Sequence, residues 1–442
     1  MRRFTVFRLI CLIVPLLGYI RAEANETVAG DPFAVETAFT SMNTVAKPDG
    51  FHLSGFVESR NQLATGHFDR PISLRQKVQI EGVRRWRGLS AFISADASWD
   101  GAMNTWPGEH DPWRGGLREA YLTFDTNNFD VFVGRKVHRW GAGDGVNPMD
   151  IINPLDSKDP LASGRADNRL PVALASLTFS IGKMSFEGVF APRAEVNDTP
   201  EYGSPWEPRS LHEIRASGAA GDEEKPNQWF GDAEFGGRFF ATISGWDVAL
   251  MVFRGFVDTP LFDIGASPGG LTFTAVHPRF SAYGLSFAKG FGNQTWRGEA
   301  AFKPDYPIQI STDPADYAPS VGEADLWQGV LGWDCDIDGK YYLNVQMFTD
   351  QQSRDDAAGK RRWSGLAYEI SGLWRLDALK AGLRGKLYAA GDGALTELFF
   401  DYDVNDRWKT SVGLMIWRGE ANGVLGEYDD NDFFYLTLRR VF

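Results

Sequence analysis

The chain has 442 residues and a formal net charge of −13 at pH 7. A chain this acidic argues against nucleic acid as a partner, because nucleic-acid-binding proteins present basic surfaces to phosphate. It holds two cysteines, Cys11 in an apolar N-terminal stretch and Cys335 alone in the remainder. This excludes a disulfide framework and metal sites built from several thiolates.

The N-terminus has the three parts of a secretory signal peptide. Three arginines fall within the first eight residues, residues 9–20 are apolar, and Ala22 and Ala24 are the small residues before a cleavage site. The apolar run is shorter than the roughly 20 residues that a helix needs to cross a bilayer. We therefore expect residues 1–24 to be removed on export, which leaves a mature chain that is more acidic still.

Residues 25–50 show no regular alternation. A short helix is expected near Val35 to Met42, and the segment is interpreted as a periplasmic extension that lies under a barrel, plugs it or is disordered. From Phe51 the pattern changes, so the predicted organisation is a signal peptide (1–24), a periplasmic segment (25–50) and an outer-membrane barrel (51–442).

Beyond residue 50 the sequence consists of segments of about ten residues in which apolar and polar side chains alternate. The stretches 89–99, 340–349 and 408–417 are the clearest. The chain also contains 15 Trp, 13 Tyr and 32 Phe but no second long apolar run. Alternation with abundant aromatic residues is typical of a transmembrane β-barrel, in which only every other residue faces lipid.

The segments that connect these strands alternate between tight and long, as periplasmic turns and outer loops do in such barrels. One connector, 391–393, is short where a long one is expected. The pattern predicts an all-β, antiparallel, up-and-down barrel of about eighteen strands, with sixteen as the alternative. The tight connectors include 87–88, 126–128, 182–183, 244–245, 290–293, 336–339 and 405–406, and the long ones are 61–72, 100–116, 137–169, 193–228, 257–276, 304–323, 350–361 and 419–430.

Tryptophans gather at the predicted strand ends, where an amphipathic ring prefers the boundary between headgroups and hydrocarbon. They predict two aromatic belts rather than a soluble core. Those beside tight turns are Trp86, Trp246, Trp333, Trp374 and Trp408, and those beside long loops are Trp99, Trp140, Trp229, Trp327, Trp363 and Trp417.

The last predicted strand carries Phe434, Leu436, Leu438 and Phe442 on one face. A terminal aromatic residue on such a strand resembles the signal that the barrel-assembly machinery reads in bacterial outer-membrane proteins, so Phe442 is its predicted contact. Arg440 departs from the apolar face, and an arginine near the rim can reach the headgroups.

A barrel of sixteen to eighteen strands encloses an aqueous lumen. Charged side chains on the polar strand faces must line that lumen, since Arg or Lys facing lipid near the midplane costs about 2–4 kcal/mol. The charges either select solutes or pair across the wall and brace it. The predicted lining residues are Arg75, Lys77, Glu81, Glu119, Tyr121, Asp232, Glu234, Arg238, Arg297, Glu299, Lys303, Arg384 and Lys386.

One stretch begins the third long loop and differs from the rest. After Arg135 it reads Trp140-Gly-Ala-Gly-Asp144-Gly-Val-Asn147-Pro-Met-Asp150-Ile-Ile-Asn153-Pro-Leu-Asp156. Two Asn-Pro-x-Asp units favour successive turns, and the glycines permit close backbone approach. The stretch is therefore predicted to be an ordered loop.

The pattern G-R-x4-W-G-x-G-D-G-x-N-P-x-D-x-x-N-P-x-D resembles a family of Gram-negative outer-membrane barrels of mostly unassigned function, and it is similar to alginate-export-type barrels. The resemblance implies that this loop, residues 137–169, constricts the pore. The residues that would shape the constriction are Arg135, Trp140, Asp144, Asn147, Asp150, Asn153 and Asp156. Two other interpretations stay open, a calcium site at Asp144, Asp150 and Asp156 and a purely structural loop.

The predicted function is passive passage of small polar or charged solutes across the outer membrane, with no cofactor. No zinc-binding H-E-x-x-H or nucleophile-elbow motif is present, so an enzyme is not expected. The alternatives are a scaffold that docks a periplasmic export or electron-transfer partner, and an outer-membrane enzyme. The expected partners are outer-membrane lipid, lipopolysaccharide and small solutes, and the sequence does not indicate an oligomeric state.

Overall fold

A computed structural model describes residues 50–66, 70–141, 146–160, 168–267, 270–310, 320–354, 362–389, 392–420, 423 and 425–442. The predicted signal peptide, the predicted periplasmic segment except Gly50, and Asp144 lie outside the described residues. The barrel strands belong to one compact unit. No helix among the described residues is both long and apolar enough to cross a lipid bilayer.

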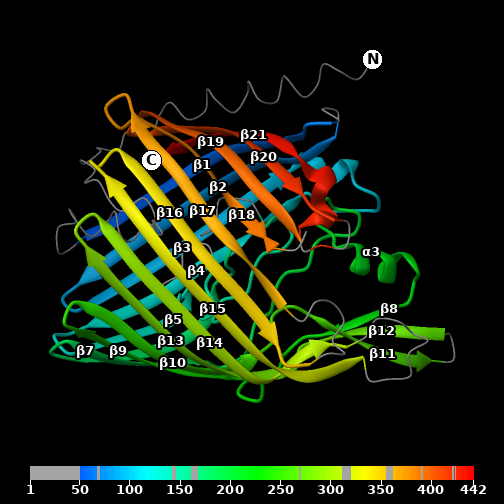
Figure 1. Cartoon of the computed structure of the whole chain (residues 1–442), viewed down its shortest axis with the longest axis horizontal. Coiled ribbons are helices and arrows are strands. Elements are labelled where there is room, and N and C mark those ends of the chain that lie inside the picture. Colours follow the sequence, from blue (N-terminus) through cyan, green and yellow to red (C-terminus); the bar gives the residue numbers. More distant parts are fainter. Residues whose placement is uncertain are drawn as a thin grey trace. The chain divides into compact units, whose positions relative to one another are not determined.

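The predicted fold is confirmed as an antiparallel barrel of 18 strands, not sixteen. Each strand pairs with its neighbours in the chain, and β1 pairs with β21 to close the ring (Figure 1). The strands in order are β1 (Gly50–Ala64), β2 (Pro71–Trp86), β3 (Leu89–Asp100), β4 (Trp113–Asp125), β5 (Phe129–Lys136), β6 (Val172–Ile181), β7 (Met184–Ala191), β9 (Glu234–Ile243), β10 (Trp246–Phe256), β13 (Arg279–Phe291), β14 (Gln294–Gln309), β15 (Val321–Ile337), β16 (Tyr341–Gln352), β17 (Arg362–Trp374), β18 (Leu379–Tyr388), β19 (Gly393–Asn405), β20 (Trp408–Arg418) and β21 (Phe433–Val441).

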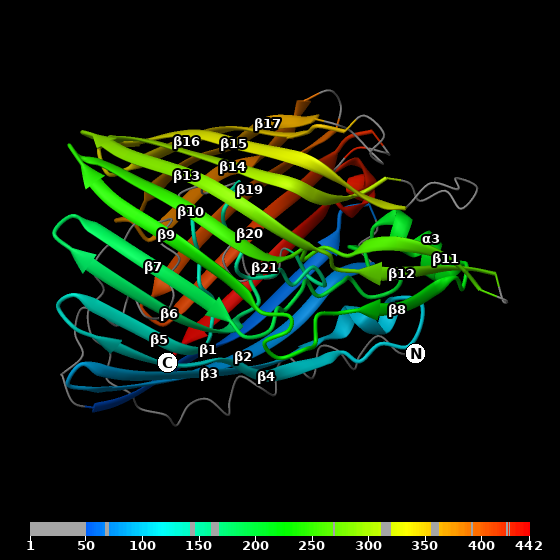
Figure 2. The ribbon, with the colours of Figure 1, turned by 90° about the horizontal axis from the view of Figure 1, so that it is seen from below.

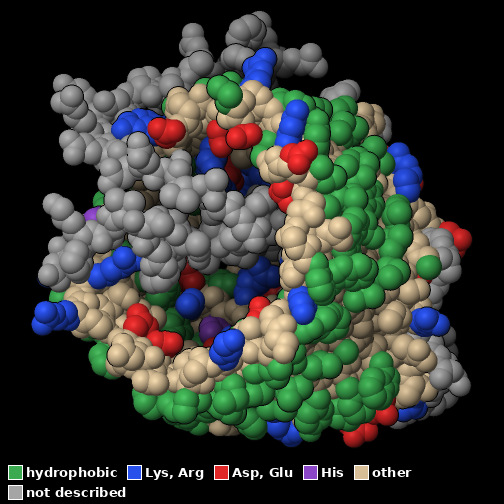
Figure 3. All heavy atoms as spheres, turned by 60° about the vertical axis from the view of Figure 1, so that its left-hand side comes forward, with side chains coloured by type: hydrophobic (Ala, Val, Ile, Leu, Met, Phe, Trp, Pro, Cys, Tyr) green, Lys and Arg blue, Asp and Glu red, His purple; other side chains and the backbone are tan. Residues whose placement is uncertain are grey.

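The alternation in sequence becomes two different surfaces. In β10, Met251 and Phe253 are 2% and 5% exposed and point inward, whereas Leu250 and Val252 are about half exposed on the outside. Figure 3 shows hydrophobic side chains covering much of the outer wall, while acidic and basic side chains gather in the hollow. A closed ring leaves no strand edge unpaired, which a sheet surrounded by lipid requires.

Tight turns gather at one end of the barrel and long connections at the other (Figure 2). Ser244 and Gly245 both have positive φ, as the two central residues of a type I′ hairpin turn do. The long loops that matter below are L3 (137–171), L4 (192–233), L5 (257–278) and L7 (353–361). The elements within the long connections are η2 (Gly101–Thr105), α3 (Arg209–Ala216), β8 (Ala220–Glu224), β11 (Leu261–Ser267), β12 (Gly270–Val276) and η4 (Gly426–Asn431).

Several predicted long loops are partly strand, and two of them hold the longest strand segments. Within 257–276, the strands Leu261–Ser267 and Gly270–Val276 form the β11–β12 hairpin, which pairs with β8 in a three-stranded sheet beyond the barrel. Residues 304–309 and 321–323 extend β14 and β15 past the predicted strand ends. The first loop forms a separate sheet and the second continues the barrel strands, although Gly, Pro and Asp in both indicate a loop from composition alone.

The belt prediction is wrong for two tryptophans. Trp140 is fully buried within L3, and Trp417 is 5% exposed among residues of the outer mouth. Both lie next to long loops, but these loops fold inward over them and remove them from the lipid surface. Trp86, Trp374 and Trp327 remain on the outside, each more than 40% exposed.

The last strand has the predicted outer face. Phe434, Leu436 and Leu438 are 45%, 48% and 40% exposed. Arg440 shares their parity, and its guanidinium lies over the Trp408 ring, 5.7 Å from the centroid. An aromatic neighbour at the tight-turn end thus accommodates this charge next to the rim.

Candidate functional site

L3 folds back between its own two ends, and Asn153 closes this neck. The side chain is fully buried. Its Oδ1 accepts from the His138 backbone N–H at 2.7 Å, and its Nδ2 donates to the carbonyls of Leu170 at 2.8 Å and Lys136 at 3.3 Å. One asparagine therefore satisfies backbone groups at the start and the end of the loop, which explains why a residue of this type is needed here.

Asp150 is the electrostatic centre of the loop. Its side chain has no exposed area, and its Oδ2 lies 3.0 Å from Arg139 Nε and 2.8 Å from Arg169 Nη2. Arg169 also donates to the Asn153 carbonyl at 2.8 Å. A buried carboxylate between two arginines holds both strands of the loop together, and removing it would leave two cations without that partner.

Trp140 fastens L3 to the wall at β7 and β9. Its indole Nε1 donates to Glu187 Oε2 at 3.0 Å. The same carboxylate pairs with His138 Nε2 at 2.8 Å and Arg238 Nη2 at 2.9 Å. Phe253 of β10 meets the indole edge-on, with centroids 6.5 Å apart. Aromatic packing and a buried carboxylate thus fix one side of the loop.

Gly141 and Met149 bring L3 against β13 and β14. Gly141 has φ +88°, and a Cβ there would lie 2.3 Å from Glu299 Oε1, so only glycine fits. Met149 is fully buried over Gly284, and its backbone N–H points at Glu299 Oε2 at 3.4 Å. The glycine in the motif is therefore needed for close contact with the wall.

The far part of L3 contacts the opposite wall. Asp159 of L3 pairs with Arg75 of β2, with Nη1 and Oδ2 3.1 Å apart. The same number of strands separates β2 from β14 in both directions around the ring. On one side these are β3, β4, β5, β6, β7, β9, β10 and β13, and on the other they are β15, β16, β17, β18, β19, β20, β21 and β1. L3 therefore reaches walls that lie half-way around the ring from each other.

Apart from Asp144, which lies outside the described residues, the predicted constriction residues fall together in and beside L3, but most of their side chains fasten the loop. Arg135 pairs with Glu195 of L4. Asn147 Nδ2 donates to the Trp140 carbonyl at 3.2 Å. Asp156 Oδ1 accepts from the Lys158 backbone N–H at 3.1 Å. Sequence reasoning placed these residues in the right loop without indicating that they bind one another.

The calcium interpretation of the loop concerns Asp144, Asp150 and Asp156. Asp150 is taken up by two arginines, and Asp144 lies outside the described residues. Among the residues that the structure describes, no group of three or more His, Cys, Asp or Glu side chains is arranged to hold a metal ion.

The charges on the barrel wall form pairs between strands. Arg384 and Glu397 face each other across β18 and β19 at 2.6 Å. Such cross-strand pairs brace the sheet, which is the second of the two interpretations of the wall charges. The other pairs are Lys77–Asp96 at 3.0 Å, Arg297–Asp334 at 2.9 Å, Lys380–Glu369 at 2.9 Å, Arg238–Glu187 at 2.9 Å and Arg439–Glu58 at 2.6 Å.

The remaining predicted lining residues vary in role. Lys303 lies over the rings of Phe280 and Tyr306, 5.7 and 5.4 Å from their centroids. Asp232 is not on a strand: it precedes β9, and its carboxylate accepts two backbone N–H groups of L4. The others are on inward positions of their strands, namely Glu81, Glu119, Tyr121, Glu234 and Lys386.

L4 and L5 hold L3 from behind through residues that the sequence analysis did not single out. Asn197 of L4 accepts the Leu155 N–H at 2.6 Å and donates to Thr259 of L5 at 3.1 Å. Of the residues that the sequence did not indicate, Glu187 makes the most contacts with L3 and its surroundings. The alternation in β7 predicts that Glu187 points inward. Its partner Trp140 lies in L3, far away in the chain, so no pattern in the sequence indicates that the two residues bind.

Asp258 of L5 lies near Arg169 and Lys303, and also near Glu234. Burial raises the pKa of Asp258 to about 7, although Arg169 and Lys303 lower it. The packed loops thus hold this proton more tightly than loops that expose the group would. The protonated Asp258 side chain therefore stabilises the packed loops. This stabilisation is complete below the ordinary aspartate pKa of 3.8 and is lost as the pH rises through about 7.

We therefore predict that packing of L3 against L5 is stronger at pH 5 than at pH 8. Hydrogen exchange of L3 amides should be faster at pH 8 after correction for the intrinsic rate. The Asp258→Asn variant should show the same corrected protection at both values. A pH difference that persists in Asp258→Asn would assign the effect to another group.

The barrel fold is similar to that of solved outer-membrane proteins. The structure is similar to Pseudomonas aeruginosa OpdK solved with vanillate, with a TM-score of 0.53 and 10% identity over 89% of this chain and 98% of that chain. A Vibrio cholerae outer membrane protein, OmpT with loop L8 deleted, gives a TM-score of 0.43 and 8% identity over 90% and 100% of the two chains. A mutant porin of Rh. blastica gives 0.41 and 13% over 89% and 100%.

The chain therefore has a porin-like β-barrel fold. A family profile described as "protein of unknown function (DUF1302)" matches residues 94–442, and the chain belongs to that family. A search of curated proteins finds no match.

Proposed function

We propose that the barrel is a passive channel for small polar or charged solutes and that L3 narrows it. The observation that carries this proposal is the span of L3, from Glu299 on β14 to Arg75 on β2, half-way around the ring. A loop held at both walls reduces the cross-section that a solute can use. A ring of 18 strands is otherwise wide enough for an aqueous lumen.

The character of the wall supports polar cargo. Acidic and basic side chains are visible in the hollow in Figure 3, and the named cross-strand pairs neutralise several charges of the wall. A wall of paired charges remains hydrated without strongly repelling either sign of solute. This favours a general route for small hydrophilic molecules over a strongly basic or strongly acidic conduit.

Single-channel conductance in planar bilayers tests the proposal. Deleting residues 141–156 should increase the conductance severalfold and admit larger solutes, because the crossing segment is removed. The matched control deletes residues 261–276, an equally long segment that forms the β11–β12 hairpin outside the barrel (Figure 2). The control should leave the conductance close to that of the intact protein.

Equal conductance of the two deletion variants would contradict a constriction by L3. A silent intact barrel that also stays silent after the 141–156 deletion would contradict the channel itself. That result would favour the scaffold interpretation.

A further inference from the structure

The outer wall formed by β13–β17 has a groove of about 620 Å³. Its floor is one row of mostly small residues that are neighbours across five strands. Pairing runs from Leu285 to Ala300, then to Gly329, Thr349 and Ser364. These positions share the outward parity of Leu331 and Met347, which are 39% and 54% exposed. The groove therefore opens toward lipid.

Larger side chains rise on both sides of this row. On the side toward the tight turns, Leu331, Met347 and Leu366 line the groove. On the side toward the long loops, Phe302 and Trp327 stack with centroids 4.1 Å apart. Pairing continues that second ridge across Gln351 to Arg362, which also lines the groove. The result is an apolar trench with one cation at its end.

The size and slope of the trench fit one lipid chain. Four steps between neighbouring strands, each about 4.8 Å, give a floor of about 19 Å. One leaflet provides about 15 Å, half of a hydrocarbon core of roughly 30 Å. Ser364 is the third residue of β17 and Leu285 the seventh of β13, counted from the long-loop end. The floor therefore descends into the membrane away from Arg362.

We propose that this trench seats one acyl chain of lipopolysaccharide and that Arg362 binds a phosphate of its lipid A. Arg362 begins β17 directly after L7, at the end of the barrel with the long loops. Long loops face outward in outer-membrane barrels, so the trench lies in the leaflet that carries lipopolysaccharide. A guanidinium binds phosphate oxygens in a bidentate manner, which gives the charge complementarity.

This site is separate from the channel and requires only that the barrel lie in the outer membrane. Small floor residues give room for the chain, and the aromatic ridge supplies contact area. Arg362 and the floor residues all have outward parity on their strands. Changes in the trench are therefore expected to leave conductance unaltered.

The central test places a larger side chain on the floor of the trench. A Cβ at Gly329 would meet only Thr349 Cγ2 at 3.8 Å and the Glu299 carbonyl at 4.0 Å, so Gly329→Leu fits the strand and occupies the trench. Gly188→Leu is the matched control: Gly188 is an outward glycine of β7 with nothing within 4 Å of its Cβ. Native mass spectrometry of the full chain in detergent, titrated with lipid A, measures binding.

We expect one lipid A to bind the intact protein and Gly188→Leu with equal affinity, and Gly329→Leu to bind roughly tenfold more weakly. Circular dichroism should show the same strand content in all three. Equal lipid A affinity of the two leucine variants would overturn the proposal. So would a Gly329→Leu variant that changes the oligomeric mass, because the trench would then seat a second barrel.

Arg362 gives a test that does not depend on filling the trench. Arg362→Ala should lower the lipid A affinity about fivefold, the effect of one basic residue near a phosphate layer. Arg362→Lys should restore most of it. Dephosphorylated lipid A should bind the intact protein and Arg362→Ala alike. Phosphatidylglycerol binding as strong as lipid A binding would contradict lipopolysaccharide as the occupant.

Discussion

Replacing Asp150 with alanine is expected to release L3 from the lumen and to increase single-channel conductance severalfold. The carboxylate is fully buried between Arg139 and Arg169, and no other described contact brings the two arginines together. Breaking a buried charge cluster costs about 3–5 kcal/mol, and the lower end applies because both arginines reach solvent. A loss of about 3 kcal/mol would leave the crossing segment only weakly held.

Limited proteolysis gives a second measurement: trypsin should cleave Asp150→Ala faster than the intact protein at Arg139, Lys158 and Arg169. Asp156→Asn is the matched control in the second Asn-Pro-x-Asp unit. Burial raises the pKa of Asp156, and its carboxylate accepts a backbone N–H that an amide oxygen can also accept. Asp156→Asn should therefore conduct like the intact protein. If Asp150→Ala loosened L3 without changing conductance, L3 would not be the narrowest part of the pore.

Much of the barrel could be predicted because lipid imposes a rule that every strand must follow. One face must be apolar and the other polar, so positions such as Leu250 and Met251 separate by parity alone. The order of tight and long connectors then gives strand number and orientation. These patterns are local in the sequence, so they can be recognised without knowing which strands pair with each other.

The site was predicted less completely because its contacts join distant parts of the chain. The motif predicted an ordered loop over residues 140–156, but it did not predict that Glu187 would bind Trp140 or that Arg169 would share Asp150. Each of these pairs depends on the path that the loop takes in three dimensions after it leaves the barrel wall. Trp140 and Trp417 were assigned to the lipid belt for the same reason. Their distance from strand ends was correct, but the loops turned inward.

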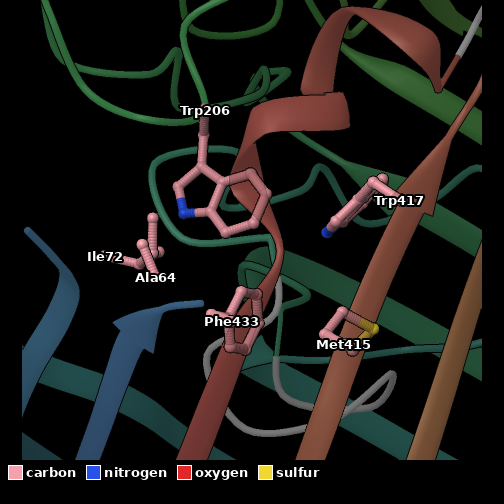
Figure 4. Packing of buried hydrophobic residues seen from close by; sticks show 6 residues of the cluster. All are labelled: Ala64, Ile72, Trp206, Met415, Trp417 and Phe433. Atoms are coloured by element: carbon pink, nitrogen blue, oxygen red, sulfur yellow. The ribbon is translucent and has the colours of Figure 1, made fainter. Parts of the chain in front are cut away.

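L4 is the clearest example of an arrangement without a sequence signal. Trp206 lies between β7 and β9 in the chain, yet packs against Ala64, Ile72, Met415 and Phe433 on the other side of the outer mouth (Figure 4). The Arg209 backbone N–H donates to Glu427 of η4 at 3.1 Å, which strengthens the same attachment. L4 therefore reaches from the wall at β7 and β9 to the rim at β1, β2, β20 and β21.

Replacing Trp206 with alanine is expected to free L4 from the far rim and to widen the outer entrance. The indole is 3% exposed, and the centroid distances to the rings of Trp417 and Phe433 are 5.8 and 6.3 Å. Truncating a buried tryptophan costs about 3–5 kcal/mol. If about 3 kcal/mol of this holds L4 closed, the open population should rise about a hundredfold.

Tryptic cleavage at Arg209 and Arg215 of α3 measures that opening, and uptake of larger sugars into liposomes measures its effect on passage. Trp229→Ala is the control, since Trp229 belongs to the same loop but is 60% exposed. It should cleave and conduct like the intact protein. Faster cleavage in Trp206→Ala with unchanged uptake would mean that L4 covers the mouth without limiting entry, because the narrowest point would then lie below it at L3. Unchanged cleavage would mean that the hydrogen bond from the Arg209 backbone to Glu427 holds L4 without the indole.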